Sequence, residues 1–485
     1  MNLNDFLQPL ALPAWIVSLP LSAAGLSVAL PKIGKPAAIF TAVATSMLVV
    51  MLGGEVLLHG AIQMQVGGWP APLGISLHAD GLSAAMLAIA CLIAGVVTFY
   101  AASYFSTEGA PRTFWPLWLF LWAALNALFL SGDIFNLYVT LELLGLSAVS
   151  LVALSRSAEA LPAAMRYLLV SLTGSLSYLM GVALLYAANG TLDLNTLAAA
   201  GPGMPSISTA FALMAAGLVM KSALFPMHFW LPPAHANAPA PVSAALSALV
   251  VKGSIYILMR LWLTLFEPLI NPGAADLIGL MAAIAILWGS IQALLAQRLK
   301  MLVAYSTVAQ IGYIFLVFPL SSMPTAGQTA WQGGLYFVLS HACAKAAVFL
   351  AAGNVIYSVG HDRISELKGI VRRLPVSMFA FALAGVSLIG LPPSGGFVAK
   401  WLYLNAALKA GYWWWAVLIM SGGLLATAYV FRFFSRAFSY SADTVEGRPV
   451  PWIMEWAAFV LASCAVILGL TAPVVIELFT AGQPF

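Results

Sequence analysis

The chain consists of long apolar stretches separated by short polar segments. Fourteen of these stretches approach the roughly 20 residues that a helix needs to cross the hydrocarbon core of a bilayer. They lie near residues 10–30, 36–58, 80–104, 113–131, 133–155, 163–188, 208–230, 240–265, 275–297, 302–320, 331–357, 375–407, 413–438 and 452–480. The pattern predicts an all-α, polytopic membrane protein with about fourteen transmembrane helices.

Basic residues fall almost entirely in every second connection between these spans. The odd-numbered connections and the span ends beside them carry Lys32, Lys35, Arg112, Arg156, Arg298, Lys300, Arg363, Lys368, Arg372, Arg373, Arg432, Arg436 and Arg448. The even-numbered connections hold almost none; Lys409 is the exception, and Arg260 lies near a helix end. The positive-inside rule places the odd connections in the cytoplasm and both termini on the outer side. One span more or fewer would destroy this asymmetry, so the charges support the count.

Two spans are interrupted by helix-breaking sequences. The seventh runs into FPMHFWLPPAHANAPAP and the twelfth contains IGLPPSGG. Proline removes a backbone donor, and broken helices at membrane depth are tolerated where they are buried in protein or line wet space. Each break adjoins a lysine, Lys221 before the first and Lys400 after the second. Paired broken helices are typical of inverted repeats that flank an ion site.

This symmetry predicts a division of the chain into four parts. Helices 1–3 would occupy residues 1–112, a first inverted five-helix repeat 113–265, a second repeat 275–438 and the last helix 452–485. Because five is odd, the second repeat would enter the membrane from the opposite side.

Six of the ionisable residues within the predicted spans are the main candidates for function. They are Glu142, Lys221, Lys252, His341, Lys345 and Lys400. A charge at the bilayer centre costs roughly 2.5–3.5 kcal/mol on the lenient insertion scale, and such residues usually face the interior and mark ion pathways. The set therefore indicates an ion or proton translocator.

Lysine and histidine suit proton transfer in such a setting. A lysine that is removed from water is less strongly held in its charged form, and a neighbouring carboxylate reverses that effect. Glu142 and Lys221 would thus form a switchable proton site, while His341 and Lys345 share a helix face and could relay protons. Alternatives remain: Lys252 and Lys345 could snorkel towards headgroups, and Glu142 could be half of a static ion pair.

Composition agrees with a lipid-facing surface. The 485 residues are 62% hydrophobic and 7% charged, where soluble domains average about 25% charged residues. The net charge of +4 is explained by topology, so we expect no nucleic acid partner. The three cysteines have no metal spacing, and we find no cleavable signal peptide and no nucleotide, haem or iron–sulfur motif. We expect no cofactor, no metal and no catalytic residue.

Six motifs carry a resemblance to a known family. They are LELLGLSA at Glu142, KSALFPMHFWLPPAHANAPAPVSAALS from Lys221, VKGSIYILMR at Lys252, RLKMLVAYSTVAQIGYIFL from Arg298, SHACAKAAVFLAAG at His341 and LPPSGGFVAKWLYL at Lys400. Nearly the whole chain resembles the antiporter-like family shared by respiratory complex I, membrane-bound hydrogenases and Mrp-type cation/proton antiporters.

The resemblance implies a role for each of these residues. Glu142 and Lys221 match the family's coupling pair, and Lys252 matches the lysine that connects half-channels. His341 and Lys345 match the eleventh-helix pair, and Lys400 matches the twelfth-helix group that opens to the outer side. It also implies other membrane subunits as partners, protons with Na⁺ or K⁺ as the transported ions, and the inner (plasma) membrane as the location.

Which family member the chain represents depends on finer features. The stretch GGWPAPLGISLHADGLSA and Lys400 resemble the D subunit of Mrp-type antiporters, while Arg166 stands where a lysine is more usual. His228 and His235 lie beside the first break as supporting candidates, and the simpler interpretation is that they only bond loose backbone. A proton-pumping subunit of a complex I-like or hydrogenase complex, a stand-alone secondary transporter and a non-conducting scaffold are the alternatives. Whether a redox partner drives the chain stays open.

Overall fold

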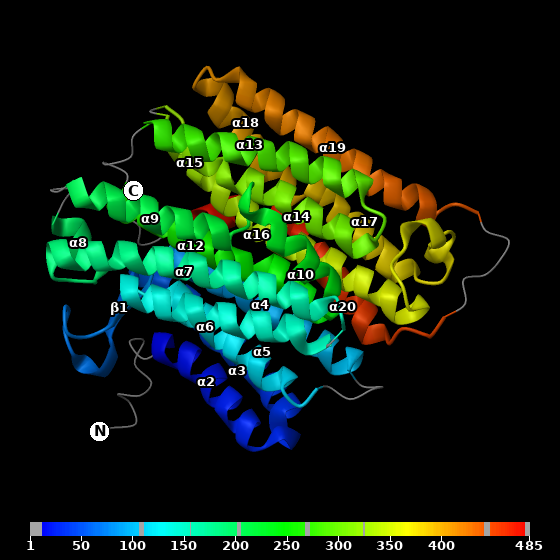
Figure 1. Cartoon of the computed structure of the whole chain (residues 1–485), viewed down its shortest axis with the longest axis horizontal. Helices are drawn as coiled ribbons and strands as arrows, with labels where there is room; N and C mark the ends of the chain where they lie inside the picture. Colours follow the sequence, from blue (N-terminus) through cyan, green and yellow to red (C-terminus); the bar gives the residue numbers. More distant parts are fainter. Residues whose placement is uncertain are drawn as a thin grey trace.

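The computed structural model describes residues 12–105, 111–155, 157–200, 205–266, 272–323, 325–440 and 447–480. It is a bundle of long helices whose axes are roughly aligned, with a small antiparallel hairpin at one end (Figure 1). The elements before the first break are α2 (Leu12–Ala29), α3 (Gly34–His59), β1 (Ile62–Gln65), β2 (Ser76–Ala79), α4 (Gly81–Tyr104), α5 (Phe114–Leu130), α6 (Ile134–Val152), α7 (Ala160–Asn189), α8 (Leu194–Ala200) and α9 (Pro205–Lys221). Those after it are α10 (Leu231–Asn237), α11 (Ala240–Ala245), α12 (Val251–Leu261), α13 (Pro272–Leu295), α14 (Leu299–Phe315), α15 (Val317–Ser321), α16 (Gly327–Val359), α17 (Pro375–Ile389), α18 (Gly395–Lys409), α19 (Trp413–Ala437), α20 (Trp452–Leu470) and α21 (Ala472–Thr480).

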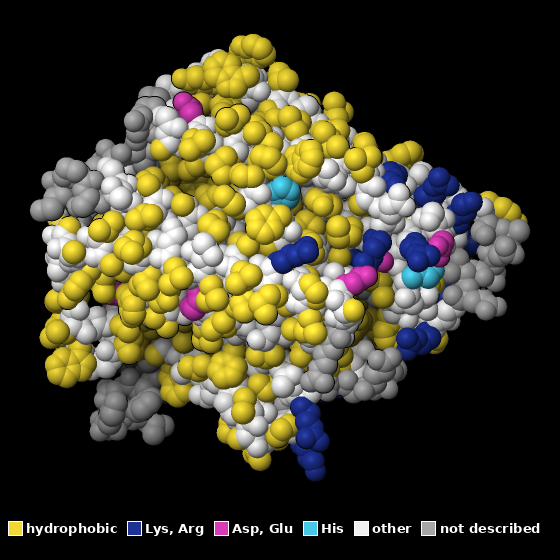
Figure 2. Space-filling model, in the orientation of Figure 1, with side chains coloured by type: hydrophobic (Ala, Val, Ile, Leu, Met, Phe, Trp, Pro, Cys, Tyr) yellow, Lys and Arg dark blue, Asp and Glu magenta, His cyan; other side chains and the backbone are white. Residues whose placement is uncertain are grey.

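The helices confirm the predicted spans. Within the described residues, eleven helical spans are long and apolar enough to cross a membrane, and three shorter apolar helices occupy the remaining predicted positions. Large apolar side chains such as Leu424, Phe431 and Met47 are about two-thirds exposed on the outside of the bundle. Figure 2 shows apolar side chains over most of one face. The chain is therefore a multi-pass membrane protein whose outer surface faces lipid.

Basic side chains gather towards one end of the bundle. Figure 2 shows Lys and Arg concentrated at the end where the connection near residues 360–374 lies, and Figure 1 places β1 at the opposite end. This distribution matches the alternation expected from the sequence. Arg156, one of the predicted basic loop residues, lies outside the described residues.

Two spans form the interior of the bundle. An 18-residue window of Ala240–Phe266, which contains α11 and α12, is entirely buried, and so is one of α16. Only 33% of the corresponding window is buried in α2, α19 and α20. Helices that are surrounded by protein can carry polar side chains, because those side chains find partners there rather than lipid.

Both predicted breaks are present. The helix α9 ends at Lys221, and a turn containing Ala223 (φ 57°) leads to a short 3₁₀ turn, Met227–Trp230, and then to α10. The seventh predicted span, 208–230, thus extended nine residues too far. Helix α17 ends at Ile389, and the next residue, Gly390, has a φ of 89° that favours glycine. Helix α18 begins where the Ser394 hydroxyl accepts a hydrogen bond from the Phe397 amide at 3.2 Å.

Candidate ion-transfer site

Glu142 and Lys221 form an ion pair inside the bundle. The Lys221 Nζ atom lies 3.6 Å from Glu142 Oε2, with the Lys221 and Glu142 side chains 6% and 18% exposed. The ammonium also donates to the Leu141 carbonyl at 3.4 Å. On α7, the Ser175 hydroxyl donates to the Glu142 carboxylate. The carboxylate therefore keeps a hydrogen-bond donor of its own if the lysine loses its charge.

Glycine lets the pair form where α7 and α9 pack closely. A Cβ atom at Gly174 would lie 2.8 Å from the Gly217 carbonyl oxygen and 3.1 Å from Lys221 Cγ. Any side chain at position 174 would therefore push the two helices apart and displace the lysine stem. The position of Lys221 opposite Glu142 depends on this close contact.

Lys252 lies in the first turn of α12 and is 1% exposed. Its ammonium donates to the Ser247 carbonyl, which belongs to a π-helical turn, Leu246–Val250, immediately before α12. Such wide turns recur at functional sites, since they shift the backbone out of the regular hydrogen-bond ladder. The Ser247 hydroxyl lies 3.0 Å from that of Thr307 on α14. Lys252 is thus held in the protein interior, and the alternative that it snorkels to a headgroup does not describe this structure.

His341 and Lys345 lie one turn apart on α16, and both are buried. The Lys345 ammonium donates to the Val303 carbonyl at 3.1 Å and to the Ser306 hydroxyl at 2.5 Å. Within the described part of the chain, neither ring nitrogen of His341 has a hydrogen-bond partner. The charges of both Lys252 and Lys345 act on this imidazole. His341 is therefore within electrostatic reach of two lysines, with both ring nitrogens available for proton exchange.

Lys400 bridges the two halves of the second broken helix. From α18 its ammonium donates to the Leu388 and Ile389 carbonyls at 3.2 and 2.8 Å, the last carbonyls of α17. It also lies 4.4 Å from the centre of the Tyr313 ring. A cation at a helix C-terminus and over an aromatic face is stabilised by both. Gln310 of α14 donates to the same Leu388 carbonyl at 3.1 Å.

The supporting residues differ in their surroundings. His235 of α10 is 1% exposed, and its ring stacks on Phe349 with the centroids 4.9 Å apart. The charges of Lys300, Lys345 and Lys252 all act on it, so it belongs to the interior cluster. His228 is half-buried in the 3₁₀ turn, stacked on Phe225.

Arg166 lies apart from the ionisable residues of the interior. It is exposed on α7, beside a buried tyrosine, Tyr167, that stacks on Trp230 with the ring centroids 4.2 Å apart. Arg166 is therefore on the outer surface of the bundle, separate from the buried candidates.

Polar contacts connect the helices that carry the six candidates. In order across the bundle these are Glu142–Lys221, Ser222–Ser254 (2.9 Å), Lys252–Ser247, Ser247–Thr307, Ser306–Lys345 and the Leu388 carbonyl shared by Gln310 and Lys400. The candidates thus form one row from α6 to α18. Ser306 and Gln310, which sequence reasoning did not select, are four residues apart on α14. That spacing on one helix face was the available signal.

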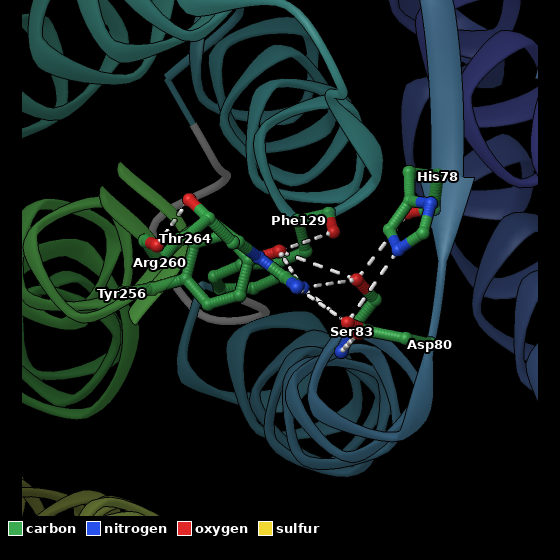
Figure 3. Close-up of polar contacts among 7 residues, drawn as sticks. All are labelled: His78, Asp80, Ser83, Phe129, Tyr256, Arg260 and Thr264. Carbon is green, nitrogen blue, oxygen red and sulfur yellow. Dashed lines mark hydrogen bonds and ion pairs between the residues drawn. The ribbon is translucent and has the colours of Figure 1, made fainter. Parts of the chain in front are cut away.

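A second polar cluster lies at the hairpin end of the bundle (Figure 3). Asp80 caps the N-terminus of α4 by accepting from the Ser83 amide at 2.9 Å, and Arg260 of α12 binds both its carboxylate oxygens. Arg260 also donates to the Ser83 hydroxyl and the Tyr256 hydroxyl, each at 3.0 Å. His78 Nε2 lies 3.6 Å from Asp80. Both partners of this bidentate pair are buried, so it joins α4 to the helix that carries Lys252.

The described residues contain no group of three His, Cys, Asp or Glu side chains that could hold a metal ion.

A multi-pass bundle with a buried row of lysines, histidines and a glutamate defines an ion-translocating class of membrane protein. Residues 131–426 match the family described as NADH:quinone oxidoreductase/Mrp antiporter, and the chain belongs to that family.

The relatives are named as subunits of two kinds of complex, and the solved structures add a third. The chain is 35% identical to an NADH-quinone oxidoreductase subunit N of Desulforudis audaxviator, over 91% of this chain and 88% of that one. It is 29% identical to the D subunit of a Na(+)/H(+) antiporter of Alkalihalophilus pseudofirmus, over 82% and 80%. Among solved structures, a chain of the Mrp complex from Dietzia sp. superposes with a TM-score of 0.90 at 25% identity, covering 98% of both chains. A chain of an archaeal membrane-bound sulfane sulfur reductase gives 0.89 at 26% identity, covering 97% and 96%.

Proposed function

We propose that the chain is the proton-translocating, antiporter-like subunit of a multisubunit membrane complex, of the Mrp type that exchanges a cation, Na⁺, for protons. The observation that carries this proposal is the buried Glu142–Lys221 pair and its connection through polar contacts to Lys252, Lys345 and Lys400. A row of proton-exchanging groups that crosses the bundle has no use in a purely structural membrane subunit, because each buried charge costs insertion energy.

In the proposed mechanism Glu142 controls the proton on Lys221. When the carboxylate is near, the ammonium is favoured; when it moves away, the amine releases its proton towards Lys252. His341 passes the proton between Lys252 and Lys345, since a neutral imidazole can accept at one nitrogen and donate at the other. Lys400, at the second break, releases it towards the outer side. Water supplies the remaining steps between these groups.

The proposal includes an organisation and an orientation. Residues 113–265 and 275–438 would be inverted repeats between the flanking parts 1–112 and 452–485, and the two broken helices support this division. The gathering of basic side chains at one end supports a cytoplasmic location for that end, with both termini outside and the chain in the inner membrane.

A second candidate is a proton-pumping subunit of a complex I-like or hydrogenase-like complex. The higher sequence identity to the quinone oxidoreductase subunit, 35% against 29%, favours it. The TM-scores of 0.90 for the Mrp chain and 0.78 for the complex I chain of Thermus thermophilus favour the first candidate. A stand-alone transporter is the third.

Everted membrane vesicles that contain the complete complex test these candidates. Added Na⁺ is expected to dissipate an imposed pH gradient without any respiratory substrate. Replacing Lys252 by methionine should slow this exchange about 100-fold, the lower end of what a positioned proton-transfer group contributes.

Each alternative has its own outcome in the same vesicles. Proton pumping that requires an electron donor and ignores Na⁺ would favour the redox complex. Full activity of the chain alone in liposomes would favour a stand-alone transporter. Normal exchange by an assembled Lys252→Met complex would contradict the relay.

A further inference from the structure

A polar cavity opens where the basic side chains gather. It has a volume of about 600 Å³, and its lining includes Ser155, Asn237, Arg298, Asp362 and Arg448. Ser155 is in the 3₁₀ turn after α6, and Asn237 is the last residue of α10. Arg298 precedes α14, Asp362 follows α16, and Arg448 is in the connection between α19 and α20. The cavity thus reaches into the bundle beside the broken seventh span.

Lys300 also lines this cavity, and it is 2% exposed. Its ammonium donates to the Ala238 carbonyl at 2.5 Å, three residues after His235. The Asp362 carboxylate holds the turn that presents it, since it accepts from the Lys300 amide at 3.1 Å and from Arg298 Nε at 2.9 Å. The lysine is therefore fixed at the inner end of a polar cavity.

His235 lies on the interior side of Lys300. The charges of Lys300, Lys345 and Lys252 all act on this buried imidazole. Among the described residues, His235 Nδ1 has no hydrogen-bond partner. Lys300 thus stands between the open cavity and the cluster that contains three of the proposed relay residues, Lys252, His341 and Lys345.

We propose that this cavity is the mouth through which protons at the basic end of the bundle enter the relay, with Lys300 as the entry residue and His235 as its acceptor. This inference rests on the proposed function and adds an entrance to it. A proton from water in the cavity binds the free electron pair of the Lys300 amine. The resulting ammonium gives up one proton to the free nitrogen of His235, and the amine is restored.

The simpler role for Lys300 is to anchor the segment after the break through Ala238. Replacing Lys300 by arginine distinguishes the entry role from the anchoring role. It keeps the charge and can donate to the same carbonyl, but it does not release a proton in proteins.

The first experiment compares Lys300→Arg and Lys300→Met with the native complex in everted vesicles. Both variants are expected to slow proton exchange about 100-fold, as for a lost proton-transfer group. Native exchange by Lys300→Arg would overturn the entry role and leave the anchoring role. If the methionine variant does not assemble, the arginine variant alone decides.

The second experiment blocks the cavity itself. Ser155→Cys places a thiol on its wall. Ser150→Cys is the matched control, because Ser150 is close in sequence but lines a separate surface pocket of about 650 Å³. Both are made in a Cys464→Ser background, since Cys91 and Cys343 are buried and Cys464 is partly exposed. The probe is a membrane-impermeant, positively charged methanethiosulfonate.

Labelling at position 155 is expected to reduce exchange about 100-fold relative to the unlabelled variant, while labelling at 150 leaves it unchanged. Labelled Ser155→Cys that exchanges normally, or a thiol at 155 that the reagent cannot reach, would overturn the inference. If the inference fails while the Lys221→Ala variant is inactive, the proposed function stands without this entrance.

Discussion

Complexes that carry Lys221→Ala should assemble normally and lose proton exchange by about 100-fold or more. The alanine removes the only amine of the pair and leaves Glu142 with its serine donor, Ser175, so the carboxylate stays tolerated while the proton-binding group is gone. Exchange is measured in everted vesicles as the rate of pH-gradient dissipation on addition of Na⁺. Blue-native electrophoresis of the same membranes establishes assembly.

Two further variants separate charge from proton transfer. Lys221→Arg keeps the positive charge beside Glu142 but cannot release a proton, so it should be nearly as inactive as alanine. The Glu142→Ala/Lys221→Ala double variant should be no slower than either single variant, because residues that act as a unit are not additive.

Lys409→Ala is the matched control for these substitutions. Lys409 is also the last residue of its helix, α18, but it is exposed. This variant should exchange protons like the native chain. Normal exchange by an assembled Lys221→Ala complex would refute the proposed relay.

Replacing Asp80 by alanine is expected to destabilise the folded chain by about 3–5 kcal/mol, the usual result of removing one partner of a buried ion pair. The Arg260 guanidinium would remain buried without a carboxylate to bind, and α4 would be left without its N-terminal cap. The measurement is the unfolding temperature of the detergent-solubilised complex, followed by intrinsic fluorescence.

Asp276→Ala serves as the control, because Asp276 is exposed on α13 and its replacement should leave the unfolding temperature unchanged. The Asp80→Asn/Arg260→Met double variant should recover part of the lost stability, since it buries no unpaired charge. An Asp80→Ala variant as stable as the native complex would show that Arg260 finds another partner.

Hydrophobic run length located the transmembrane helices well, because the bilayer imposes it directly on the sequence. It failed at the seventh span. Phe225 and Trp230 continue the apolar pattern after α9 has ended at Lys221, so hydropathy alone could not place the break. The hairpin of Ile62–Gln65 and Ser76–Ala79 was also missed, since each strand is only four residues long.

The candidate site was predictable in part. An isolated charge in an apolar span is visible in the sequence, and the pairing of Glu142 with Lys221 followed from opposite sign. The partners of Arg260 and Lys300 were not predictable. Asp80 is 180 residues from Arg260, and Ala238 is 62 from Lys300, so only the three-dimensional packing brings them together. Arg260 and Lys300 lie near the ends of predicted spans, so their charges were interpreted in terms of topology. In the structure both side chains make contacts inside the bundle.

The Lys400 ammonium ties the end of α17 to α18 across the second break. A neutral amine is a weaker donor to the two carbonyls and loses its attraction to the Tyr313 ring. Loss of the proton would therefore loosen the joint between the half-helices, and its return would tighten it. The residue that we propose releases protons to the outer side thus also holds the two half-helices together, and the charge and the helix geometry at this joint are coupled.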